Sequence, residues 1–234
     1  MHELLYGHIR MEVCSEQFRL GTDSMALADF CRIRPGSRVL DLGCGCGALG
    51  LLLLGADPTL RVTGLELQPE AAGQADKNVR ENGLSERMTV VCGDLRDPSA
   101  VPASGFDAVV CNPPYFPSAA GKTAAQEARR VARTELQCTL ADVCRAAARA
   151  LRWGGRCFLV HKPDRLADLV CALRGERLEP KRIRFVRHRP DTSVSLMLTE
   201  ARLGGRPGLE IQQDLILFLA DGSESPEYQR IYHR

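Results

Sequence analysis

Short apolar runs alternate along the chain with longer segments of mixed polarity. The apolar runs predict buried strands at Arg38–Asp41, Arg61–Glu66, Met88–Cys92, Phe106–Cys111 and Arg156–His161. The mixed segments predict helices at Ser24–Cys31, from the glycines after Asp41 through Leu54, and at Pro69–Asn82, Thr139–Leu151 and Pro163–Leu173. Strands that alternate with helices in this way predict a doubly wound parallel sheet.

The last part of the chain departs from this alternation. Lys181–Val186 and Ser193–Ala201 predict paired strands, and a further strand is predicted near Leu215–Leu219. Residues 1–20 are predicted to pair as short strands, and residues 116–137 to form an insertion-like loop. The predicted fold class is therefore α/β, with a Rossmann-like, seven-stranded, mostly parallel sheet and an antiparallel C-terminal edge hairpin.

Length and composition indicate one ordinary domain. The 234 residues predict an N-terminal extension over 1–35, a core over 36–202 and a C-terminal tail over 203–234. The chain is 44% hydrophobic and 26% charged, which is typical of a soluble globular protein. No apolar run approaches the roughly 18 residues that span a membrane. The N-terminus has no signal-peptide pattern, so we expect a cytoplasmic location and no membrane partner.

Ten cysteines raise the question of metal binding or disulfides. Six lie in apolar segments and are predicted to be small core residues: Cys31, Cys92, Cys111, Cys144, Cys157 and Cys171. Cys44 and Cys46 form a C-x-C pair, but no second pair with zinc spacing exists, so we expect no metal site. A disulfide framework is not expected in a chain of this length without an export signal.

A glycine-rich loop follows the first predicted strand. Gly45, Gly47 and Gly50 fit the pattern G-x-G-x-x-G, and Glu66 lies 21 residues after Gly45 at the end of the second strand. This spacing lets a carboxylate bind a ribose diol while the backbone approaches a nucleotide closely. A nicotinamide or flavin dinucleotide is therefore one candidate ligand.

Two further acids favour a different ligand. Asp41 directly precedes the glycines, where it is unfavourable beside a pyrophosphate but suits the ammonium group of a methionine moiety. Asp94 follows the third strand and is placed to accept a hydrogen bond from an adenine amino group. Acids at three successive strand ends are hard to explain as separate helix caps or solvated loops.

The tetrapeptide Asn112-Pro113-Pro114-Tyr115 follows the fourth strand. Its two prolines end the strand and stiffen the turn, which lies at the sheet edge where open α/β proteins bind ligands. An Asn carbonyl accepts a hydrogen bond from an exocyclic amino group, and a Tyr ring stacks on a planar base. The segment predicts a holder for a planar nitrogen nucleophile.

These motifs resemble those of the class I S-adenosylmethionine-dependent methyltransferases. The segment from Asp41 through Gly43, Gly45 and Gly47 resembles their first motif. Glu66 resembles their ribose-binding acid and Asp94 their adenine-side acid. The resemblance also assigns cofactor binding to the residues that follow these acids, Leu67 and Leu95. Asn112 to Tyr115 resembles the motif of amino-group methyltransferases. The resemblance implies S-adenosyl-L-methionine as cofactor.

A closer resemblance is to the valine-tRNA adenine-N6 methyltransferases, which modify the adenine beside the anticodon. The residues that carry it are Phe18 to Ser24, Asn112 to Phe116, Ala132 to Glu135 and Asp221 to Ser223. It implies that Gly21, Thr22 and Asp23 help to close the cofactor pocket. The chain departs from these relatives at Val131 to Glu135, where they often carry Ala-Arg-His/Tyr-Glu.

The implied chemistry is methylation of an adenine amino nitrogen. The Asn112 side-chain carbonyl and the Pro113 backbone carbonyl each accept one N6–H, which orients the nitrogen lone pair. Tyr115 stacks on the extruded base, with Phe116 beside it. The implied partner is transfer RNA, and the sequence indicates no oligomeric state.

A basic segment, Lys181 to Arg189, has two interpretations. Arg182 and Arg184 alternate with apolar residues, so one face of the predicted strand is cationic. Such a face either protects a sheet edge or contacts RNA phosphates. The second interpretation assigns RNA binding to Lys181, Arg182, Arg184 and Arg187.

Other functions remain compatible with the motifs. A protein glutamine-N5 methyltransferase presents a similar nucleophile and uses a similar Asn-Pro-Pro-Tyr segment, although those enzymes usually carry a helical N-terminal domain. A guanine-N2 methyltransferase of ribosomal RNA is another candidate. A non-catalytic cofactor- or RNA-binding module is a different class, against which the intact Asp41, Glu66, Asp94 and Asn112 argue.

Overall fold

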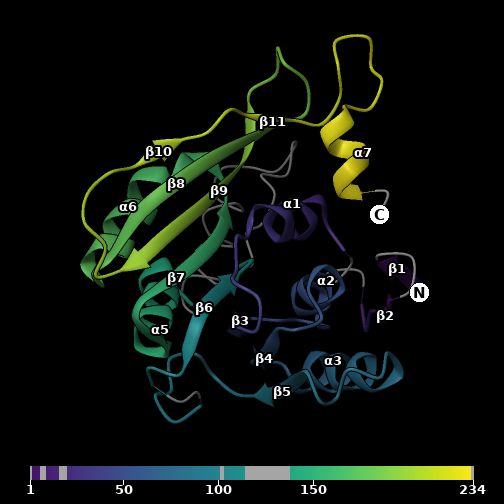
Figure 1. Ribbon diagram of the computed structural model, residues 1–234, viewed down its shortest axis with the longest axis vertical. Helices are drawn as coiled ribbons and strands as arrows, with labels where there is room; N and C mark the ends of the chain where they lie inside the picture. Colours follow the sequence, from purple (N-terminus) through teal and green to yellow (C-terminus); the bar gives the residue numbers. More distant parts are fainter. Residues whose placement is uncertain (1, 6–8, 16–19, 101–102, 114–137, 233–234) are drawn as a thin grey trace, which may run out of the picture.

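A twisted central sheet organises the molecule (Figure 1). The computed structural model describes residues 2–5, 9–15, 20–100, 103–113 and 138–232. Within them the sheet has nine strands in the order β10-β8-β9-β7-β6-β3-β4-β5, with the short β11 also paired to β8. Its strands are β3 (Arg38–Leu42), β4 (Arg61–Glu66), β5 (Met88–Cys92), β6 (Phe106–Cys111), β7 (Leu151–His161), β8 (Leu178–Arg187), β9 (Val194–Leu203), β10 (Glu210–Ile211) and β11 (Leu215–Ile216).

Helices cover both faces of this sheet, as a doubly wound fold requires. The helices are α1 (Thr22–Phe30), α2 (Ala48–Ala56), α3 (Pro69–Glu81), α5 (Leu140–Ala150), α6 (Leu166–Gly175) and α7 (Pro226–Tyr232). Apolar residues of α1, α2, α3 and α7 belong to one buried cluster, and those of α5 and α6 to another. The strands between the clusters are buried on both sides, which explains their nearly continuous apolar runs.

The predicted fold class is confirmed. Strands β3 to β7 pair in parallel, and β9 runs antiparallel between β7 and β8, so the predicted hairpin forms the end of the sheet. Seven strands make up the predicted sheet, and the two-residue strands β10 and β11 add to it along β8. The predicted N-terminal pair is also present as β1 (His2–Leu5) and β2 (Ile9–Glu12).

Several predicted boundaries are wrong. The fifth strand begins at Leu151 rather than Arg156, and β7 includes Gly154 and Gly155. Pairing with β6 there jumps from Phe106–Leu151 to Ala108–Arg156, so the extra residues bulge out of the ladder. The helix predicted from Pro163 is a 3-10 turn, Pro163–Arg165, followed by α6.

The C-terminal tail is more structured than its polarity predicts. Helix α7 packs on α1, where the Tyr232 hydroxyl donates to the Thr22 carbonyl at 2.6 Å and Arg230 pairs with Asp29 at 2.5 Å. The strand predicted near Leu215–Leu219 is reduced to the two residues of β11. The predicted loop 116–137 lies outside the described residues.

Two of the cysteines predicted to be core residues, Cys92 and Cys171, are exposed. Cys111, Cys144 and Cys157 are buried, and Cys31 is partly buried. In the described part of the chain, no helix is long and apolar enough to cross a membrane.

Candidate functional site

The predicted site residues meet along the edge of the sheet that is formed by the carboxyl ends of its central strands. Asn112 follows β6, the glycine loop follows β3, Glu66 ends β4 and Asp94 follows β5. These four strands are neighbours in the order β6-β3-β4-β5 and all run in the same direction. With about 4.8 Å between adjacent strands, this edge spans roughly 14 Å from Asn112 to Asp94. An extended, nucleoside-sized molecule matches that span.

The glycine loop turns sharply between β3 and α2. Gly43, Gly45 and Gly47 have φ values of 72°, 55° and 90°, in the left-handed region that other residues rarely adopt. Gly47 is the N-cap of α2, so the helix begins at the end of the loop. A Cβ atom placed on Gly43 would meet no atom within 4 Å, which shows open space in front of the loop.

Glu66 is held rigidly beneath this loop. Its Oε2 accepts a hydrogen bond from the Gly45 N–H at 2.9 Å, and its Oε1 accepts one from the Gln68 N–H at 2.9 Å. The side chain is buried. A carboxylate has about four acceptor positions, so two remain for a ligand diol.

Asp41 lies deeper, at the end of β3. It is 1% exposed, and its Oδ2 accepts a hydrogen bond from the Gly50 N–H at 3.1 Å. Burial raises the pKa of Asp41 to about 7; the Gly50 N–H opposes this shift, and the negative charge of Glu66 adds to it. A bound cation close to this carboxyl would lower that pKa and favour the ionised form.

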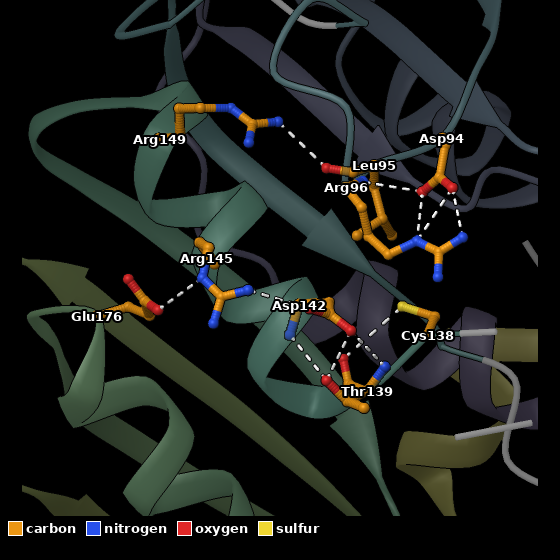
Figure 2. A network of polar contacts seen from close by, with 9 residues as sticks. All are labelled: Asp94, Leu95, Arg96, Cys138, Thr139, Asp142, Arg145, Arg149 and Glu176. Carbon is orange, nitrogen blue, oxygen red and sulfur yellow. Dashed lines mark hydrogen bonds and ion pairs between the residues drawn. The ribbon is translucent and has the colours of Figure 1, made fainter. Parts of the chain in front are cut away.

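Asp94 forms an ion pair with Arg96 of the same loop (Figure 2). Arg96 Nη2 donates to Asp94 Oδ2 at 2.6 Å, and Arg96 Nε lies 3.0 Å from both carboxylate oxygens. The Arg96 side chain lowers the pKa of Asp94, so the acid stays ionised and able to accept hydrogen bonds. From α5, Arg149 Nη2 donates to the Leu95 carbonyl at 3.1 Å and fixes the loop on the sheet.

Helix α5 begins with a capping box near this loop. The Thr139 hydroxyl accepts from the Asp142 N–H at 3.1 Å, and Asp142 Oδ2 accepts from the Thr139 N–H at 3.0 Å. The start of α5 is thereby fixed directly after the segment that lies outside the described residues.

Asn112 is anchored by α1. Its Nδ2 donates to the Ser24 hydroxyl at 2.9 Å, and Ser24 itself is buried. Pro113 is buried beside it. Tyr115 and Phe116, predicted to contact the base, lie outside the described residues.

The predicted pocket-closing residues surround the start of α1. Gly21 is the N-cap of the helix, and a Cβ atom there would lie 2.2 Å from Asp23 Oδ1. Thr22 is exposed. At the other end of the site, Leu67 is 50% exposed directly after Glu66, the residue predicted to bind the ribose.

Arg182, predicted to contact RNA, is instead buried and paired. Its Nε donates to Glu200 at 2.5 Å, its Nη2 donates to the Phe30 carbonyl at 3.1 Å, and its guanidinium lies 4.3 Å from the Phe30 ring centroid. The residue is 9% exposed. Arg182 is therefore no part of an exposed cationic face.

The neighbouring basic residues of β8 hold the C-terminal segment. Arg184 Nη2 donates to both oxygens of Glu227 at 2.9 and 2.7 Å, and Arg187 Nε donates to Asp214 at 2.5 Å. The partly exposed Lys181 donates to the Arg206 carbonyl at 3.1 Å. The predicted phosphate contact stays a prediction, and the geometry favours the alternative of a covered edge strand.

Three residues of the site were not assigned a role from the sequence. Ser24 and Arg96 bond to predicted site residues, although nothing in their local sequence indicates it. Asn78 of α3 is 1% exposed, and its Nδ2 lies 2.8 Å from both the Glu12 carbonyl and the Cys46 carbonyl. It ties β2 to the glycine loop from a helix face that has no polar pattern to reveal it.

The hydrogen-bond acceptors of this site fit S-adenosyl-L-methionine. Asp41 suits an ammonium group, Glu66 a ribose diol and Asp94 an adenine amino group, and open space lies in front of Gly43. These acids follow one another along the sheet edge, with Asn112 at the end beyond Asp41. A pyrophosphate would instead lie against Asp41 and Glu66, which argues against a dinucleotide.

Comparison with known proteins gives matches over most of the chain. A family model described as the methyltransferase small domain matches residues 17–167. The tRNA1(Val) (adenine(37)-N6)-methyltransferase of Porphyromonas gingivalis is 32% identical over 222 residues, covering 91% of this chain and 86% of the relative. The enzyme of the same name from Tolumonas auensis is 29% identical over 223 residues, covering 94% and 90%.

Solved structures show the same fold. A predicted O-methyltransferase from Agrobacterium tumefaciens superposes with a TM-score of 0.76 at 24% identity, covering 91% of this chain and 96% of that chain. TrmN from Thermus thermophilus superposes with a TM-score of 0.57 at 23% identity, covering 77% of this chain and 48% of that chain.

Proposed function

The chain belongs to the methyltransferase small domain family, and we propose that it methylates the N6 amino group of an adenine in transfer RNA. The relatives named as tRNA1(Val) (adenine(37)-N6)-methyltransferases support this substrate and the position beside the anticodon of valine tRNA. We further propose a cytoplasmic location, as suits an enzyme that modifies transfer RNA.

The single observation that carries the reaction is the anchored Asn112. Because its Nδ2 donates to Ser24, its Oδ1 is left to accept a hydrogen bond from a substrate amino group. The adjacent Pro113 has no N–H and contributes its carbonyl as a second acceptor. Two acceptors on one amino group orient its lone pair away from the turn.

When bound, S-adenosylmethionine supplies an electrophilic methyl group on its sulfonium sulfur. Glu66 and Asp94 would hold the nucleoside part of that molecule, and Asp41 would bind its ammonium group, on the strand next to the one that carries Asn112. Asn112 and Pro113 would hold the adenine nitrogen on that side. This arrangement contributes mainly orientation and charge placement, which are worth several kcal/mol in order of magnitude.

The glutamine-N5 and guanine-N2 alternatives are tested by the same assay. Unmodified valine tRNA is incubated with tritiated cofactor, beside the same RNA with its loop adenine replaced by guanine. Label in the first RNA alone supports the proposal. Label in both RNAs contradicts the proposal. Label in a release-factor protein with none in either RNA also contradicts it.

A further inference from the structure

A cationic hollow lies at the opposite edge of the sheet from Asn112. β6 and β7 begin at this edge, and β9 ends there because it runs antiparallel to its neighbours (Figure 1). The hollow encloses about 280 Å³. Five arginines line it: Arg32, Arg34, Arg152, Arg156 and Arg202. Asp107 is the one acid among its lining residues. We call this site the arginine hollow.

Most of its positive charge is not neutralised by the protein. Arg152 pairs with Asp107 at 2.7 Å, and Arg156 lies 3.4 Å from Glu200. Within the described residues, no carboxylate pairs with the other three arginines of the hollow. A chain with a net charge of only +2 thus concentrates cations at this edge.

A second hollow extends the first along the same edge. It encloses about 410 Å³, shares Trp153 and Arg202 with the arginine hollow, and adds Lys181 and Arg206. Its lining residues include no acid. The two hollows therefore form a continuous cationic path past one aromatic ring.

That ring, Trp153, is held as a platform. It is the only tryptophan of the chain, and it is 68% exposed. The indole lies so close over Gly204 that a Cβ atom there would come within 2.2 Å of the ring. The Arg177 guanidinium is 5.5 Å from the ring centroid. An exposed indole with cations beside it offers a face on which a base can stack.

We propose that this edge binds an unpaired stretch of RNA, with phosphates in the arginine hollow and a base stacked on Trp153. Guanidinium groups suit phosphate geometry, and an aromatic ring between cations is the usual platform for single-stranded nucleic acid. The inference rests on the proposed function in one respect: the RNA is the transfer RNA substrate. Strands of five to six residues put this edge roughly 20 Å from Asn112, well within the reach of one RNA molecule.

The single tryptophan gives a direct test. Oligouridylate or unmodified valine tRNA is titrated into the full chain while intrinsic tryptophan fluorescence is recorded. Because Trp153 is the only emitter of its kind, a stacked base quenches the signal saturably. Affinity falls with added salt, since released counterions drive binding to phosphates.

Two charge reversals distinguish RNA binding at this site from non-specific attraction to the positive charge of the protein. Arg34→Glu, in the arginine hollow, is expected to weaken oligouridylate binding at least tenfold. Arg87→Glu makes the same charge change at an exposed position before β5, outside either hollow, and is expected to weaken binding less than twofold. Both variants keep wild-type affinity for S-adenosylmethionine, which shows that they fold.

Fluorescence anisotropy of labelled RNA measures binding independently of Trp153. Saturable RNA binding without quenching, or equal weakening by the two charge reversals, overturns the proposal, as does the absence of any RNA binding at low salt. Methylation is scored separately. If tRNA quenches the fluorescence but is never methylated, RNA binding at the arginine hollow is supported and the proposed function is contradicted. If tRNA is methylated without quenching, the proposed function is supported and RNA binding at the hollow is contradicted.

Discussion

Asn112 Nδ2 lies 2.9 Å from Ser24 Oγ, and this hydrogen bond joins the turn after β6 to helix α1. Because Nδ2 is the donor in this bond, the amide oxygen is left as an acceptor for a substrate amino group. Ser24 is therefore a positioning residue for Asn112. Its burial keeps water from competing for the bond.

We predict that Asn112→Ala lowers turnover by roughly 10²–10³, because an interaction formed with the reacting group is lost. Ser24→Ala removes one hydrogen bond of about 1 kcal/mol and lowers turnover by roughly five-fold. Steady-state methylation kinetics measure both effects. The affinity for S-adenosylmethionine, measured by calorimetry, should change less than twofold in either variant. A larger loss of cofactor affinity than of turnover would show that Asn112 acts in cofactor binding instead.

Glu66→Ala is predicted to weaken S-adenosylmethionine binding by more than tenfold. Hydrogen bonds to a charged group are worth about 1.5–3 kcal/mol each, and the variant also frees the Gly45 N–H that orders the loop. Isothermal calorimetry gives the affinity directly. Glu86→Ala, at an exposed position before β5, is the matched control and should bind as wild type does. Equal binding by all three proteins would exclude Glu66 from the site.

Asp41 makes stability depend on pH. Its pKa is raised from 3.8 to about 7 by burial, so the folded state holds the proton more tightly than the unfolded state. Its stabilising contribution is complete below pH 3.8 and is lost as pH rises through about 7. The loss amounts to roughly 4 kcal/mol at most. Urea unfolding at pH 5 and pH 8 should show Asp41→Asn gaining on wild type at the higher pH; a constant difference would contradict the raised pKa.

The buried pair of Arg182 and Glu200 predicts a stability effect rather than an RNA effect. Arg182→Met leaves the Glu200 carboxylate without its nearest partner, which is expected to cost about 3–5 kcal/mol. The double variant Arg182→Met, Glu200→Leu removes both charges and should recover most of that loss. Urea denaturation measures each variant. A stable Arg182→Met protein with weakened RNA binding would instead support the phosphate contact.

The sequence predicted the sheet edge well because each strand of the core is a separate apolar run. Asp41, Glu66, Asp94 and Asn112 then follow from strand ends alone, since parallel strands bring their carboxyl ends together. The sequence prediction failed where contacts with distant residues determine the environment of a side chain. Arg182 alternates with apolar residues like a surface cation, but Glu200 and Phe30 from distant elements enclose it.

Other features leave no local signal at all. Gly154 and Gly155 have the pattern of a helix stop, yet the bulge against β6 places them within β7. Helix α7 has a polar sequence and is stabilised by its contacts with α1, through Arg230 and Tyr232. Short amphipathic segments of this kind depend on packing rather than on intrinsic propensity.

The Sγ atoms of Cys14 and Cys46 lie 3.4 Å apart. Cys14 follows β2 and Cys46 lies in the glycine loop, and Asn78 binds the backbone of both segments. Burial raises the pKa of Cys46 to about 12, so the more accessible Cys14 reacts first. Treatment with diamide is expected to join them, the two thiols losing two protons and two electrons while diamide is reduced to its hydrazine.

A disulfide requires the sulfurs to approach to about 2.05 Å, which displaces the loop that carries Gly45 and Gly47. Oxidation should therefore weaken S-adenosylmethionine binding several-fold, and dithiothreitol should restore it. Peptide mapping by mass spectrometry under non-reducing conditions identifies the cross-link, and Cys14→Ser is the control that oxidation leaves unchanged. Cross-links through other cysteines, with none between Cys14 and Cys46, would show that the segment after β2 and the glycine loop do not stay in contact in solution.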